Sequence, residues 1–145
     1  MKKTLGLSAG YSGTPLLKKL GVKEGSHMAV ISPPRGFVAS LPDLPAGAII
    51  SQRGATKADV ILWFIKSSRD LGTIASAIDR MPPASGMLWV AWPKKASGVF
   101  TDLTEDVIRA AALRSGLVDT KVCAIDETWS GLRLSRRRNQ EKDGA

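Results

Sequence analysis

The sequence predicts an α/β domain, a three-layer sandwich in which a mostly parallel sheet lies between helices and ends in a C-terminal antiparallel hairpin. Residues 58–65 and 87–92 are almost continuously apolar, which is typical of strands covered on both faces. Apolar residues at helical spacing follow each stretch, and a helical crossover makes the strands that it joins parallel. The chain has 145 residues, which is one domain and enough to bury a core without disulfides.

The first elements are short and have clear boundaries. Thr14 can cap a helix that Pro15 opens and Gly21 ends, because proline suits the first helical position and glycine the left-handed stop. Residues 27–31 form a short apolar strand that stops at a serine and two prolines. One or two helical turns near residues 37–41 and a weak strand at 48–51 complete this half of the chain.

Two longer helices are expected in the second half. Residues 71–81 and 103–115 each place their apolar side chains on one helical face. The expected caps and stops are Ser67 or Ser68 with Pro82 for the first helix, and a capping box of Asp102 and Glu105 with Gly116 for the second.

A hairpin is expected at the end of the domain. Residues 122–125 read as a third core strand, and 126–128 leave room only for a tight reversal. Residues 129–136 alternate apolar and polar side chains, which predicts a more exposed antiparallel partner. We expect 59–65, 87–92 and 122–125 to be adjacent, parallel and buried.

Several segments resemble a family of short bacterial proteins that is defined only as a domain of unknown function. They are Gly10-Tyr11-Ser12-Gly13-Thr14-Pro15-Leu16, residues 18–21, the stretch 87–98 that reads MLWVAWPKKASG, and VCAIDE with WSGL at 122–132. This resemblance covers nearly the whole chain and carries no known reaction or site.

The layout is also similar to the later half of the S-adenosylmethionine-dependent methyltransferase fold, which implies a truncated Rossmann-like arrangement. That fold places a glycine-rich loop after its first strand, where this chain has Pro33 and Pro34, which lack backbone N–H donors. It places an acid after its second strand, where this chain has Arg53, which favours a phosphate over a ribose diol. We therefore expect S-adenosylmethionine to bind weakly or not at all.

As a rule, parallel α/β sheets bind ligands at the edge formed by the carboxyl ends of their strands, so the candidate ligand site lies in the loops that follow the strands there. That rule selects residues 32–36, the turn after Ile65, 93–101 and 126–129. Within them, two ammonium groups, a hydroxyl and a flexible glycine suit a phosphate or carboxylate, and a tryptophan can stack on a ring. The candidates are Trp92, Lys94, Lys95, Ser97, Gly98, Arg53, Asp126 and Glu127.

Each candidate also has a structural alternative. The segment after residue 92 can be a solvated loop whose tryptophan packs in the core. Asp102 could meet Asp126 and Glu127 at this edge for acid–base work or for a metal, but Asp126 can close its turn through its own backbone and Asp102 can act as a helix cap.

The charge favours anionic partners, because 21 lysines and arginines stand against 13 acids and give a net charge of +8. The expected nucleic-acid contacts are Arg133, Arg136, Arg137 and Arg138, and the alternative is a solvated tail that aids solubility.

We expect a flexible arm at residues 1–9, a single domain at 10–138 and a flexible tail at 139–145. The longest apolar run, residues 60–65, is too short to cross a bilayer, and residues 1–10 lack the apolar stretch of a signal peptide, which predicts a cytoplasmic protein without a membrane partner. One cysteine excludes an internal disulfide, and one histidine, His27, excludes a Cys/His zinc site within the chain. A metal site would have to rest on carboxylates, and no metal is expected.

Three functions remain open. The first is a binding module for an anionic ligand, namely a nucleotide, a phosphate or a nucleic acid. The second is an enzyme that uses S-adenosylmethionine or another nucleotide in a modified pocket. The third is an interaction subunit of a larger complex. The sequence identifies neither a catalytic residue nor a cofactor, and it does not indicate the oligomeric state.

Overall fold

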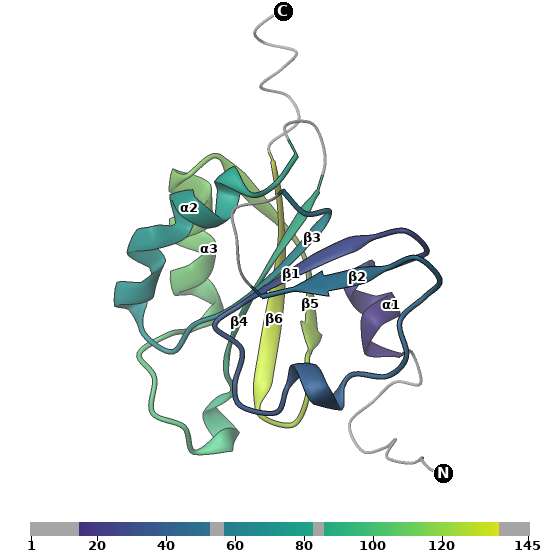
Figure 1. The fold of residues 1–145 in the computed structure, drawn as a ribbon. Coiled ribbons are helices and arrows are strands. Elements are labelled where there is room, and N and C mark those ends of the chain that lie inside the picture. The colour runs from purple at the N-terminus through teal and green to yellow at the C-terminus, as the bar shows by residue number, and fades with distance from the viewer. Residues whose placement is uncertain (1–14, 53–56, 83–85, 137–145) are drawn as a thin grey trace, which may run out of the picture.

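A computed structural model describes residues 15–52, 57–82 and 86–136 of the chain (Figure 1). Its sheet has six strands in the order β2-β1-β3-β4-β6-β5. The first four in this order run parallel, and β6 runs antiparallel to both of its neighbours. The strands are β1 (His27–Ile31), β2 (Ile49–Ser51), β3 (Val60–Phe64), β4 (Met87–Pro93), β5 (Leu117–Ala124) and β6 (Trp129–Arg136). The mixed, mostly parallel α/β fold is thus confirmed.

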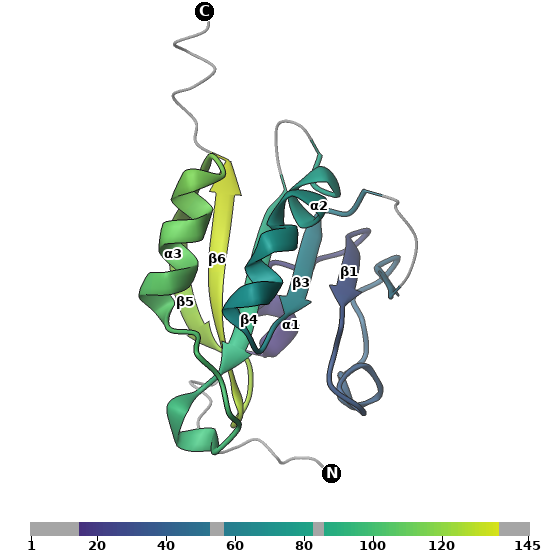
Figure 2. The same cartoon turned by 90° about the vertical axis from the view of Figure 1, so that its left-hand side faces the viewer.

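Helices cover both faces of the sheet (Figures 1 and 2). α2 (Ile74–Asp79) and α3 (Glu105–Arg114) lie on one face, and α1 (Leu16–Leu20) lies on the other. Short 3-10 helices are η2 (Val38–Ser40), η3 (Ser68–Thr73) and η4 (Lys95–Ser97). The strands carry apolar side chains on both faces, so each layer has its own core. The α1 core includes Trp89, whose indole Nε1 donates to the Leu20 carbonyl oxygen over 3.0 Å.

Most of the helix boundaries agree with the sequence. Ser67 caps η3, because its Oγ accepts from the Arg69 N–H, and Gly21 ends α1 at a φ of 94°. The capping box expected at Asp102 is wrong: Thr104 Oγ1 accepts from the Val107 N–H over 3.2 Å. The Asp102 carboxylate instead turns away from α3 and binds Ser68.

The expected place and burial of the third core strand are also wrong. β6 lies between β4 and β5, so residues 122–124 belong to an edge strand in which Val122 is 48% exposed, and only Ile125, which follows the strand, is fully buried. The return strand is the buried one, with Leu132 and Leu134 fully enclosed under α2 and α3. On its other face, a Cβ at Gly131 would come within 2.8 Å of Ile125. β6 can pack on both faces, whereas the Thr120–Lys121 part of β5 suits an edge.

Within the described ranges, no helix is long and apolar enough to cross a membrane.

Candidate functional site

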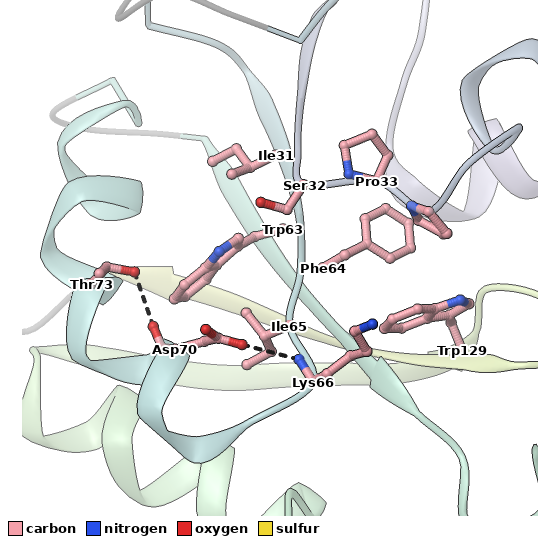
Figure 3. Close-up of a pocket in the computed structure, with 11 residues that line it drawn as sticks. Ile31, Ser32, Pro33, Trp63, Phe64, Ile65, Lys66, Asp70, Thr73 and Trp129 are labelled. Atoms are coloured by element: carbon pink, nitrogen blue, oxygen red, sulfur yellow. Dashed lines mark hydrogen bonds between the residues drawn. The ribbon is translucent and has the colours of Figure 1, made fainter. Parts of the chain in front are cut away.

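A cleft of about 390 Å³ opens at the carboxyl ends of β1 and β3 (Figure 3). The loop that follows β1 and the loop that follows β4 both extend beyond this edge of the sheet (Figure 2). The cleft is lined by Ile31, Ser32, Pro33, Pro34, Trp63, Phe64, Ile65, Lys66, Asp70, Thr73 and Trp129. This is the edge at which parallel α/β sheets bind their ligands.

Aromatic rings form much of the cleft wall. Trp63 and Phe64 are consecutive in β3, so they belong to opposite faces of the sheet, yet both reach the cleft because the strand ends there. Phe64 packs edge-to-face on Trp129 with ring centroids 5.0 Å apart, and on Phe37 at 4.9 Å. These contacts hold the Phe64 ring in a fixed orientation.

The cleft also presents polar groups at the ends of the two strands. Ser32 follows β1 with a φ of 55°, a left-handed conformation that is uncommon for a residue other than glycine. Lys66 is exposed, and its side chain extends from the end of β3 toward Trp129 (Figure 3). Asp70 is already engaged, because its Oδ2 accepts from the N–H groups of Lys66 and Ser67, each over 3.2 Å.

A second, more open hollow adjoins the cleft and shares Lys66 with it. Its other lining residues are Ser67, Val99, Phe100 and Asp102. Asp102 accepts two hydrogen bonds from Ser68, from the N–H over 2.7 Å and from Oγ over 2.6 Å, and these lower the pKa of its carboxyl.

The structure places the predicted loop residues at the carboxyl edge but outside the lining of the cleft. Trp92 is buried in the core under α2 and α3, Lys94 is half-buried and Lys95 is exposed. Ser97 Oγ donates to the Lys94 carbonyl oxygen over 2.7 Å, and Gly98 ends η4 at a φ of 83°.

The hairpin between β5 and β6 lies against this loop, because the Lys94 N–H donates to the Thr128 carbonyl oxygen over 2.8 Å. Asp126 Oδ1 accepts from the N–H groups of Thr128 and Trp129, so it closes its own turn. Glu127 is exposed. Arg53 lies outside the described residues.

The two C-terminal arginines that the structure describes, Arg133 and Arg136, do not share one surface. Arg133 Nε donates to Thr120 Oγ1 over 2.8 Å on the face that carries α1. Arg136 reaches to the opposite face, where Nη2 donates to the carbonyl oxygens of Ile78 and Met81 at the end of α2. Arg137, Arg138, the expected arm and tail, and the 10–14 segment lie outside the described residues.

The cleft lies at the sheet edge that the sequence selects, but most of the side chains named as ligand candidates lie outside its lining. Of the four segments that the edge rule selects, 32–36, the turn after Ile65 and 126–129 contribute residues to the cleft, and 93–101 does not. Trp63 and Phe64 gave no functional signal, because an apolar strand explains them, and Lys66 is a single lysine without a motif. Within the described ranges, no group of three His, Cys, Asp or Glu side chains could hold a metal ion.

Residues 45–138 match the model of a family described as protein of unknown function (DUF3052). No curated protein matches the sequence.

Several solved structures are similar in fold. A SAM dependent methyltransferase from Aquifex aeolicus is 12% identical with a TM-score of 0.63, over 82% of this chain and 86% of that chain. Ribosomal protein L11 methylase from Lactobacillus delbrueckii subsp. bulgaricus is 15% identical with a TM-score of 0.59, over 85% and 76% of the two chains. The B. subtilis tRNA methyltransferase TrmK is 14% identical with a TM-score of 0.55, over 94% and 71%. The fold is therefore Rossmann-like in the manner of methyltransferases.

Proposed function

The chain belongs to the DUF3052 family of proteins of unknown function, and we propose that it binds a nucleotide, an anionic ligand with an aromatic base, in the cleft at the carboxyl ends of β1 and β3. The observation that carries this proposal is the combination of aromatic walls with one lysine at the same edge. A binding module of this kind needs no catalytic residue.

The aromatic walls suit the base. Trp63 and Trp129 line the cleft, and the edge-to-face contact with Phe64 fixes the Trp129 ring before a ligand arrives. A base that stacks on an aromatic side chain gains about 1–3 kcal/mol, and the gain depends little on which base it is.

Lys66 suits the phosphate. Among the described residues, its ammonium group makes no hydrogen bond or ion pair, and Asp70 beside it already accepts two backbone N–H groups. Ser32 adds a hydroxyl donor at the end of β1. An anion bound here therefore competes with no internal ion pair.

Methyl transfer from S-adenosylmethionine is not part of this proposal. The cleft presents Pro33 and Pro34, which have no N–H to offer a cofactor. S-adenosylmethionine also carries a sulfonium and an ammonium group, both of which Lys66 would repel.

Isothermal titration calorimetry of the purified full chain with AMP, adenosine, inorganic phosphate and S-adenosylmethionine tests the proposal. We expect AMP to bind more tightly than adenosine or phosphate alone, and S-adenosylmethionine to bind weakly or not at all. Lys66→Ala should weaken AMP binding several-fold and leave adenosine binding nearly unchanged.

Lys95→Ala is the matched control, because Lys95 is an exposed lysine at the same edge but outside the cleft lining. A loss of AMP binding in Lys95→Ala alone would move the anion site to the loop after β4. Binding of S-adenosylmethionine at low micromolar concentration would reject the proposal in favour of an enzyme with a modified pocket.

A further inference from the structure

Phe100 is 91% exposed, although it lies on a loop that is tied down on both sides. The next residue, Thr101, donates through Oγ1 to the Lys66 carbonyl oxygen over 2.7 Å. Asp102 then accepts the two hydrogen bonds from Ser68. Before it, the Val99 N–H donates to Ser97 Oγ over 3.1 Å. The loop therefore presents an unburied aromatic ring on an ordered backbone, and core packing does not account for it.

The position of this ring relates it to the cleft. Phe100 lines the second hollow together with Lys66, and Lys66 also lines the cleft. A ligand that leaves the cleft past Lys66 therefore enters the hollow that Phe100 borders.

We infer that the ligand is a single-stranded oligonucleotide: one nucleotide occupies the cleft, its phosphate lies at Lys66, and the neighbouring base stacks on Phe100. This inference rests on the proposed function of the cleft. An exposed aromatic ring beside a lysine is the arrangement with which proteins bind single strands, because stacking accepts any base and the cation pairs with the backbone.

The net charge of the chain agrees with a polyanion. Lys94 and Lys95 begin the same loop, and the chain as a whole has a net charge of +8. Carboxylates also lie near this edge of the sheet: Asp70 accepts two backbone N–H groups, Asp102 is held by Ser68, Asp126 closes its own turn, and Glu127 is exposed on the adjoining hairpin. A protein partner would need an apolar counterpart for Phe100, whereas any base of a nucleic acid can stack on this ring and its phosphates suit a chain with a net charge of +8.

Fluorescence anisotropy with a labelled single-stranded RNA hexamer, alongside calorimetry with AMP, tests the inference on the full chain. Phe100→Ala should weaken hexamer binding roughly ten-fold or more, as expected for the loss of one base stack. It should leave AMP binding unchanged, and Phe100→Trp should restore hexamer binding. Ile49→Ala, which shortens another exposed apolar side chain on the edge strand β2, is the control and should bind like wild type.

The outcomes separate the two proposals. If AMP binds in a Lys66-dependent manner and the hexamer binds equally well to wild type and Phe100→Ala, the inference is overturned and the cleft proposal stands. The same result combined with Phe100-dependent binding of a protein would assign the ring to protein docking. If neither AMP nor the hexamer binds to wild type, both proposals fail.

Discussion

Ser68 and Asp102 join the loops that follow β3 and β4 through a pair of hydrogen bonds, in which both the N–H and the Oγ of Ser68 donate to the two carboxylate oxygens. The two residues are 34 positions apart in the chain. This link fixes the backbone that carries Phe100 relative to the end of β3, where the cleft and the second hollow meet at Lys66.

The link predicts a specific pH dependence. The hydrogen bonds from Ser68 lower the pKa of Asp102 in the folded chain below its ordinary value of 3.8. A carboxyl with a depressed folded pKa stabilises the fold fully above its unfolded pKa, and this contribution is lost as the pH falls through the folded pKa. We expect the free energy of unfolding of wild type to exceed that of Asp102→Asn at neutral pH, and the difference to shrink below about pH 4.

Urea unfolding at a series of pH values measures this difference. Asp43→Asn, at an exposed aspartate in the loop after β1, is the control and should show no such change. A difference between wild type and Asp102→Asn that stays constant well into the acid range would contradict the role given to Ser68.

Gly131 is expected to tolerate no larger side chain. A Cβ at this position would lie 2.8 Å from Ile125 Cδ1 and 3.2 Å from Trp89 Cε3, both in the core beneath α1. Gly131→Ala should lower the free energy of unfolding by about 1–3 kcal/mol, because overpacking forces the neighbours to shift. Gly72→Ala is the matched control, since a Cβ at Gly72 meets no atom within 4 Å. Equal unfolding midpoints for the two variants in urea would contradict this, because the core would then accommodate the added methyl group without loss of stability.

Ser32 is expected to strengthen AMP binding at a cost to the stability of the fold. Its φ of 55° destabilises the folded state by roughly 1–2 kcal/mol for a residue with a side chain. Glycine avoids this strain, but its greater freedom in the unfolded chain offsets part of the gain in stability. Ser32→Gly should therefore raise the free energy of unfolding by up to about 1 kcal/mol, and it should weaken AMP binding because the hydroxyl donor is lost. Ser32→Ala removes the same hydroxyl but keeps a side chain at the strained positive φ, so it should weaken AMP binding without stabilising the fold. A less stable Ser32→Gly variant would be evidence against this explanation.

The parts of the fold that could be predicted from the sequence are those set by local pattern. β3 and β4 are continuous apolar runs, and a sheet covered on both faces gives that pattern wherever its strands are placed. The insertion of β6 between β4 and β5 depends on pairing between residues far apart in the chain, and the alternation of residues 129–136 does not encode which neighbours they have.

The site could be predicted at the level of the sheet edge but not of the side chains. The consecutive lysines at 94 and 95 led to the prediction of an anion site in the loop after β4, yet Lys95 is exposed and neither lysine lines the cleft. Lys66 begins the turn after Ile65 that the edge rule selects, but a single lysine in a turn carries no signal that distinguishes a ligand contact from a solvated side chain.

The position of β6 also bears on how the protein is made. β4 and β5 are not bonded to each other, and each pairs with β6, which is synthesised after both. While β4 and β5 have left the ribosome and residues 129–136 have not, one side of β4 and all of β5 therefore lack their partners. Unpaired strand edges are the surfaces through which nascent chains aggregate or engage chaperones. β6 thus completes the sheet, and the delay between the emergence of β5 and that of β6 sets how long the edge of β5 stays unpaired during synthesis.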